Sequence, residues 1–295
     1  MVNGETRVED EKPVVMQDLL TLFPDEDYQF QIRFGRAAPQ EFFGPTEVRG
    51  RLLAERRRWL GEMPRRYAAL LPEGIALLEE TVELARAWGT LPADFLSGAS
   101  PSGEAGALNL ALGGAWEPDF LLLSIEPEGA VRLVSGCVCF PSSWSLEEKI
   151  GKEIESIHGV VPGLNQAIGP RIHSFLAKLK PGVAWLRSNW GLSRSCELNQ
   201  HPGRNLPRLD ETVRLEEVWL RVENQALVAL PRSKGVLFGI RIAIEPFAEI
   251  CNDKTLAPRL ARALKTMPEP MARYKGLSRT RGRLIGLLSG GGEMS

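Results

Sequence analysis

Histidine is scarce in this chain of 295 residues, which contains only His158, His173 and His201. Any site that needs an imidazole as a neutral metal ligand, or as a group that titrates near neutral pH, must use one of these three. Charge of one sign is also lacking, because 36 basic residues nearly balance 37 acidic ones. No global field therefore favours nucleic acid or an anionic membrane. No run of about 18 apolar residues occurs either, so no bilayer-spanning helix is predicted.

Cysteine is the next scarce residue, with four in the chain. So few cysteines, with no secretory leader before them, indicate a reducing compartment, and we expect a cytoplasmic protein. Cys137 and Cys139 fall in a predicted strand. We expect their side chains to point to opposite faces and to pack rather than to form a clamp.

Several motifs of common enzyme classes are absent. There is no G-x-G-x-x-G after a predicted strand, no H-E-x-x-H and no G-x-S-x-G, which argues against a dinucleotide fold, a zinc protease helix and a nucleophile elbow. There is also no cysteine set for an iron–sulfur cluster. If the protein carries out redox chemistry, its electrons must come from another protein.

The composition suits one globular unit, with 43% hydrophobic residues. We predict mobile tails at residues 1–17 and 286–295 and a single α+β domain over residues 18–285. Its N-terminal part, residues 45–90, is expected to be helical, with helices over 45–63, 64–71 and 72–88. Thr46 is the expected N-cap of the first helix.

From residue 115 to 250 the pattern changes to strands. Two apolar runs flank turn residues 126–129 and predict a hairpin over residues 119–140. Further strands are expected at 184–189, 214–222, 225–229 and 235–244, and helices at 145–157, 168–179 and 256–267. Helices before and between antiparallel strands indicate an α+β fold.

The segment 139–163, CFPSSWSLEEKIGKEIESIHGVVPG, is the most informative in the chain. It places His158 after an amphipathic stretch and before a Gly/Pro turn. Apolar neighbours such as Ile154 and Ile157 suit a large planar ligand, but they suit an ordinary core equally well. His173 is the alternative imidazole ligand, whereas His201 lies in a loop context and is expected to be solvated.

The same segment resembles the alpha subunit family of haem-dependent oxidative N-demethylases. The similar motifs in it are PSSW at residues 141–144, KIG at 149–151 and IHGVVP at 157–162. Further similarity follows in the order that the family requires, at LRSNWGL (186–192), VWLRVENQALVALP (218–231), VLFGIRIAI (236–244) and the pair Tyr274–Lys275. The resemblance spans roughly residues 30–275. It departs at Asn224, where the family has arginine.

This resemblance implies a PAS-like antiparallel sheet with helices packed on it, and a haem b held by His158 as the axial ligand of the iron. It also implies oxidative N-demethylation of a small secondary amine, similar to dimethylamine, with release of formaldehyde. The electrons would come from a partner reductase that uses NAD(P)H. No contact with nucleic acid or membrane is expected.

Within the matching motifs, Arg187 and Arg221 are the candidates to bind the haem propionates, because guanidinium groups offer forked donors to carboxylates. Trp190 is the candidate to wall the cofactor site. Asp119 and Glu223 are the candidate catalytic acids that would recognise the amine. Each of these residues could equally have a structural role. Two other functions stay open, a haem-binding sensor or carrier without turnover and a cofactor-free scaffold.

Overall fold

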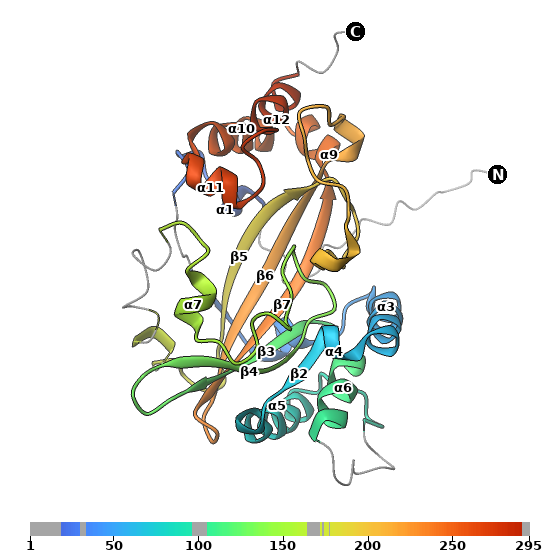
Figure 1. Ribbon diagram of the computed structural model, residues 1–295, viewed down its shortest axis with the longest axis vertical. Helices are drawn as coiled ribbons and strands as arrows, with labels where there is room; N and C mark the ends of the chain where they lie inside the picture. The colour runs from blue at the N-terminus through green and yellow to red at the C-terminus, as the bar shows by residue number, and fades with distance from the viewer. Residues whose placement is uncertain are drawn as a thin grey trace, which may run out of the picture.

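The computed structural model describes residues 19–29, 34–95, 105–163, 172, 174–176 and 178–290. Its centre is a seven-stranded sheet in which the strand order is β1-β5-β6-β7-β3-β4-β2 and each neighbouring pair is antiparallel. The strands are β1 (Gly35–Ala37), β2 (Ala68–Leu70), β3 (Asp119–Ile125), β4 (Val131–Cys137), β5 (Ala184–Ser193), β6 (Trp219–Leu230) and β7 (Gly235–Pro246). Helices surround this sheet (Figure 1), which confirms the predicted α+β class.

Strands β6 and β7 form the longest hairpin of the sheet. They pair without a register shift from Trp219 opposite Pro246 to Leu230 opposite Gly235. The sequence predicts two strands in place of β6, because the polar run from Glu223 to Gln225 interrupts the apolar pattern. That prediction was wrong, since pairing to neighbours on both sides keeps the polar run in the strand.

Strands β3 and β4 confirm the predicted hairpin. Its turn is closed by hydrogen bonds from Glu126 N to Ala130 O and from Gly129 N to Glu126 O. Gly129 has a φ of +91°, which glycine adopts without steric cost. Strand β2 was not predicted: the helix expected over residues 64–71 ends as the short α4 (Pro64–Tyr67), and the chain then pairs with β4.

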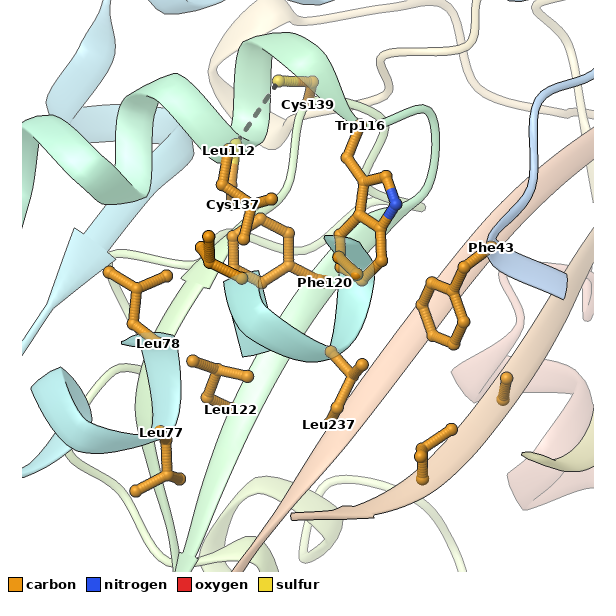
Figure 2. Close-up of a cluster of buried hydrophobic side chains, with 14 of the residues drawn as sticks. Phe43, Leu77, Leu78, Leu112, Trp116, Phe120, Leu122, Cys137, Cys139 and Leu237 are labelled. Atoms are coloured by element: carbon orange, nitrogen blue, oxygen red, sulfur yellow. Dashed lines mark hydrogen bonds between the residues drawn. The ribbon is translucent and has the colours of Figure 1, made fainter. Parts of the chain in front are cut away.

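The N-terminal helices cover one face of the sheet around β2, β3 and β4 (Figure 1). They are α2 (Pro39–Phe43), α3 (Arg49–Glu62), α4, the 3-10 turn η1 (Pro72–Gly74), α5 (Ile75–Ala87) and α6 (Ala105–Ala115). Figure 2 shows the core that they bury, in which Phe43, Trp116 and Phe120 lie over Leu122 and Leu237. Thr46 does not cap α3 as expected, because its hydroxyl donates to Glu117 Oε2 at 2.7 Å.

Cys137 and Cys139 lie side by side in this core (Figure 2), where their sulfur atoms are 3.9 Å apart. The expectation that they point to opposite faces was wrong, because residues two apart along an extended chain share a face. Both thiols are buried. They pack against α6, where Gly113 leaves room that a Cβ atom would fill, at 2.3 Å from Cys137 Sγ.

The C-terminal helices enclose a second core at one end of β5, β6 and β7 (Figure 1). They are α9 (Phe247–Asn252), α10 (Leu256–Thr266), α11 (Glu269–Tyr274) and α12 (Arg281–Leu288), joined by α1 (Leu19–Leu22) and by the 3-10 turn η3 (Leu215–Glu217). The other 3-10 turn, η2 (Pro202–Arg204), lies beside α3, where the guanidinium of Arg204 stands over the ring of Trp59. The helix expected over residues 256–267 is confirmed as α10. Helix α12 continues through Leu288, which is buried.

A third core lies on the sheet face that carries Leu121, Leu227 and Ile240, and Ile154 and Ile157 of α7 (Ile154–His158) pack against it. The helix predicted over residues 145–157 was wrong in its extent, because its first part forms turns and a bridge between Glu153 and Arg132. Half of the helix predicted over residues 168–179 lies outside the described residues. Among the helices of the described residues, none has the length and apolar character needed to cross a bilayer.

Candidate functional site

A group of polar side chains stands near one side of the sheet, on strands β5 and β6. The register places Arg187 opposite Gln225 and Asn189 opposite Glu223. Because side chains alternate along a strand, all four lie on one face, and we call them the polar cluster. Glu223 is 9% exposed and Gln225 6% exposed. Buried polar groups in a strand weaken a fold unless they are paired.

Hydrogen bonds tie the polar cluster together around Glu223. Its Oε2 atom accepts from Gln225 Nε2 at 3.0 Å and from Asn189 Nδ2 at 3.4 Å. The Oε1 atom of Gln225 is buried and has no hydrogen-bond partner among the described residues. The cluster therefore has an acceptor available for a ligand.

Arg187 supplies a positive charge to the same face. Burial lowers the pKa of its guanidinium, and the negative charge of Glu223 offsets part of that effect. Within the described part of the chain, no carboxylate forms an ion pair with Arg187. Its guanidinium carries forked donors, a geometry that suits an anionic group.

His158 ends α7 next to this face. Burial lowers the pKa of its imidazole to about 4, and the charges of Arg187 and Lys149 add to that effect. The ring is therefore neutral at physiological pH, as a metal ligand must be. Its Nδ1 atom is buried and lacks a partner among the described residues, as does Nε1 of Trp185 on β5.

Lys275, which follows α11, reaches the cluster from the C-terminal helices. Its ammonium donates to the carbonyl oxygen of Trp190 and, at 3.3 Å, to Oδ1 of Asn189. Burial lowers the pKa of Lys275 to about 8; the charge of Glu223 opposes this effect and that of Arg187 adds to it. Sequence reasoning assigned Lys275 no role, although the Tyr274–Lys275 pair belongs to the resemblance and was the signal that could have identified it.

Trp190 and Asn224 lie on the opposite face of the strands. Trp190 belongs to the second core, where its ring meets that of Phe23 edge to face at 5.1 Å. Asn224 accepts a hydrogen bond at Oδ1 from Ser188 Oγ at 2.8 Å. The departure from the family motif at residue 224 therefore removes no charge from the face that carries the polar cluster.

Asp119 lies apart from the polar cluster and holds the backbone. Its carboxylate forms a buried ion pair with Arg56 of α3. It also accepts hydrogen bonds from the backbone N–H groups of Cys139 at 2.7 Å and Phe140 at 2.9 Å. These contacts occupy both carboxylate oxygens, so the structure does not bring Asp119 together with His158 or Arg187.

The guanidinium of Arg221 is also engaged in hydrogen bonds within the protein. Its guanidinium donates to Ser142 Oγ at 2.7 Å and to the backbone carbonyls of Phe140 at 2.8 Å and Leu198 at 2.7 Å. Burial lowers its pKa to about 10. These contacts join β6 to the segment after β4 and to the segment after β5, a structural arrangement that leaves few donors for a ligand.

Of the two other histidines, His201 differs from the expectation. His173 lies outside the described residues. His201 is 4% exposed, so the prediction that it is solvated was wrong; its Nδ1 atom accepts from Gly203 N at 3.0 Å, and its ring packs against Tyr67. His201 thus shapes the turn at η2.

The residues around His158 fit a haem. They offer a neutral imidazole with an unpartnered buried nitrogen, the guanidinium of Arg187 for a propionate, and an apolar flank of Ile154, Ile157 and Trp185. The described residues hold no group of three or more histidine, cysteine or acidic side chains placed to bind a metal ion together. Haem needs fewer ligands from the protein than a free metal ion does, because the porphyrin supplies four ligands and one axial side chain is enough.

Comparison with known families agrees with the resemblance seen in the motifs. The family model described as haem-dependent oxidative N-demethylase, alpha subunit-like, matches residues 99–285, more than half of the chain. The matched range contains His158, the whole polar cluster and Lys275. It leaves out the N-terminal helices up to α5.

Proposed function

The chain belongs to the haem-dependent oxidative N-demethylase, alpha subunit-like family, and on that premise we propose that it binds haem b through His158 and oxidatively demethylates a small secondary amine. The observation that supports this proposal most strongly is the half-buried, neutral imidazole of His158 beside the half-buried cation of Arg187. Here Nδ1 is buried without a partner among the described residues.

Three side chains would share the binding of cofactor and substrate. His158 would be the axial ligand, and Arg187 would bind a propionate through its forked donors. Glu223 would hold the ammonium group of the amine, because it is buried, it is fixed by Gln225 and Asn189, and it is the acid of the polar cluster. Asp119, Arg221 and Trp190 would act by holding the strands and loops that position these groups.

The oxidative chemistry itself would be supplied by the haem, which activates dioxygen so that the N-methyl group leaves as formaldehyde. The chain would contribute orientation and exclusion of water. The buried side chains of the third core would keep the site dry on one side, and Glu223 would hold the amine in place. An alpha-subunit-like chain implies a partner subunit, and we propose that the partner is an NAD(P)H-dependent reductase.

The test is the absorption spectrum of the protein produced with ample haem supply, for the wild type, His158→Ala and the matched control Val160→Ala. Val160 is 64% exposed and lies two residues beyond His158, so its loss leaves the site intact. We expect about one haem per chain in the wild type and the control. We expect substoichiometric haem in His158→Ala, with an unchanged far-UV circular dichroism spectrum. Full haem uptake by His158→Ala would contradict the assignment, and a wild type that rejects haem would contradict the function.

A further inference from the structure

We propose that Arg187 and Lys275 together form a carboxylate-binding site beside Glu223. This inference rests on the proposed function, because the carboxylate would belong either to a haem propionate or to the substrate. In the second case the substrate class is an N-methyl amino acid, whose amine and carboxylate would meet Glu223 and the two cations.

The first support is connectivity. Lys275 donates to Asn189, Asn189 donates to Glu223, and Gln225 donates to Glu223. Arg187 stands directly opposite Gln225 in the register. Arg187 is two positions from Asn189 along β5, and Lys275 donates to Asn189, so the two cations lie on the same side of Glu223, close enough for the charge of Arg187 to act on Lys275.

The second support is charge. Arg187 and Lys275 carry two positive charges against the one negative charge of Glu223, and the lowered pKa of His158 leaves that ring neutral. Burial lowers the pKa of both cations, and Arg187 adds to the effect on Lys275. Among the described residues the cluster thus has one positive charge in excess. Buried charges are stable when they are paired, so this arrangement favours an anionic ligand.

The third support is the set of free donors. Lys275 uses two of its three N–H groups on Trp190 O and Asn189 Oδ1. Arg187 has no carboxylate partner within the described residues. A carboxylate is the ligand that a guanidinium fork and an additional ammonium hydrogen bind best.

Glu223 makes the site asymmetric. A carboxylate ligand alone would be repelled by Glu223 on one side and attracted by the cations on the other. A ligand with an ammonium group next to its carboxylate would satisfy both sides, and Oε1 of Gln225 would accept from the same ammonium. N-methylglycine has this arrangement and serves as the probe.

The test compares the wild type with Lys275→Met and with the control Lys265→Met, because Lys265 is exposed on α10. In the first arm, each protein is titrated with haem and with haem dimethyl ester, whose propionates carry no charge. In the second, the haem-loaded protein is titrated with N-methylglycine and with its methyl ester, followed by the Soret shift. In the third, the haem-free protein is titrated with acetate by calorimetry.

If the carboxylate is a propionate, the preference for haem over its ester should fall about 10- to 100-fold in Lys275→Met. If it is the substrate carboxylate, the same loss should appear in the second arm, while haem affinity stays unchanged. A wild type that binds no haem would contradict the proposed function alone, and the acetate arm would still test the site. Two results would overturn the inference. The first is a Lys275→Met variant whose preference for each free acid over its ester, and whose affinity for acetate, stay within twofold of the wild type. The second is a wild type that neither prefers a free acid over its ester nor binds acetate.

Discussion

Arg56 and Asp119 form an ion pair in which both side chains are almost fully buried, at 0% and 1% exposure. The pair joins α3 to the start of β3, and the same guanidinium donates from Nε to the backbone carbonyl of Gly113 at 2.7 Å. Because Asp119 also accepts from two backbone amides after β4, it connects three parts of the chain. We therefore expect its removal to act on stability before it acts on chemistry.

We predict that Asp119→Asn lowers the free energy of unfolding by about 3 kcal/mol, because it leaves the Arg56 guanidinium buried without its charge partner. Urea unfolding of the isolated protein measures this change. Asp94→Asn is the control, since Asp94 is exposed and should change stability by less than about 0.5 kcal/mol. A stable Asp119→Asn protein that had lost amine turnover would instead place Asp119 among the catalytic groups.

The two arginines from the family-like motifs should behave differently on replacement by methionine. Arg221→Met leaves the carbonyls of Phe140 and Leu198 without donors, so we expect a loss of unfolding free energy of about 2 to 4 kcal/mol. Arg187→Met removes a half-buried charge that has no carboxylate partner among the described residues, so the stability of this variant should hold while its haem affinity falls about tenfold. Thermal unfolding and haem titration of both variants separate the roles. If Arg221→Met and Arg187→Met lost haem affinity equally and both kept their stability, the separation into a structural and a haem-binding arginine would be contradicted.

The fold class was predictable because it depends on patterns that stand close together in the sequence. The turn of the β3–β4 hairpin, the alternation along β7 and the amphipathic α10 all appear in windows of about 20 residues. Strand β2 and the unbroken β6 were not predictable in the same way. Ala68–Leu70 has no strand pattern of its own and becomes a strand through pairing with β4, and the polar run in β6 is held by β5 and β7.

Of the site, His158 could be singled out because histidine is rare, and Arg187 and Glu223 because they fall in matching motifs. Which of the other candidates, Asp119, Arg221 and Trp190, share their face depends on register, which is a long-range property. Trp190 differs from Asn189 by one position and faces the other side. Lys275 was missed because its contact with Asn189 spans 86 positions of sequence.

Glu223 should control the charge state of Lys275. We predict that Glu223→Gln lowers the pKa of Lys275 below its value of about 8, because the charge of Glu223 is what raises that pKa against burial. The rate of acetylation of Lys275 across pH, followed by mass spectrometry, reports this pKa. Glu249→Gln is a control at an exposed acid of α9. An unchanged or raised pKa in Glu223→Gln would show that the two side chains do not interact.

Lys275 should also give the stability of the protein a distinctive dependence on pH. Its folded-state pKa is about 8, below the ordinary value of 10.5, so the unfolded chain binds more protons at this group between these two values. Stability therefore rises with pH across that window, and the desolvation cost of the charged group is fully present below pH 8. For the difference in unfolding free energy between wild type and Lys275→Met, we predict a flat line below pH 8. Between pH 8 and 10.5 that difference should rise by at most about 3 kcal/mol in favour of the wild type. Urea unfolding at a series of pH values measures it, with Lys265→Met as the control that should stay parallel to the wild type. A difference that falls with pH across this window would mean that Lys275 is stabilised, not destabilised, by its charge in the folded state.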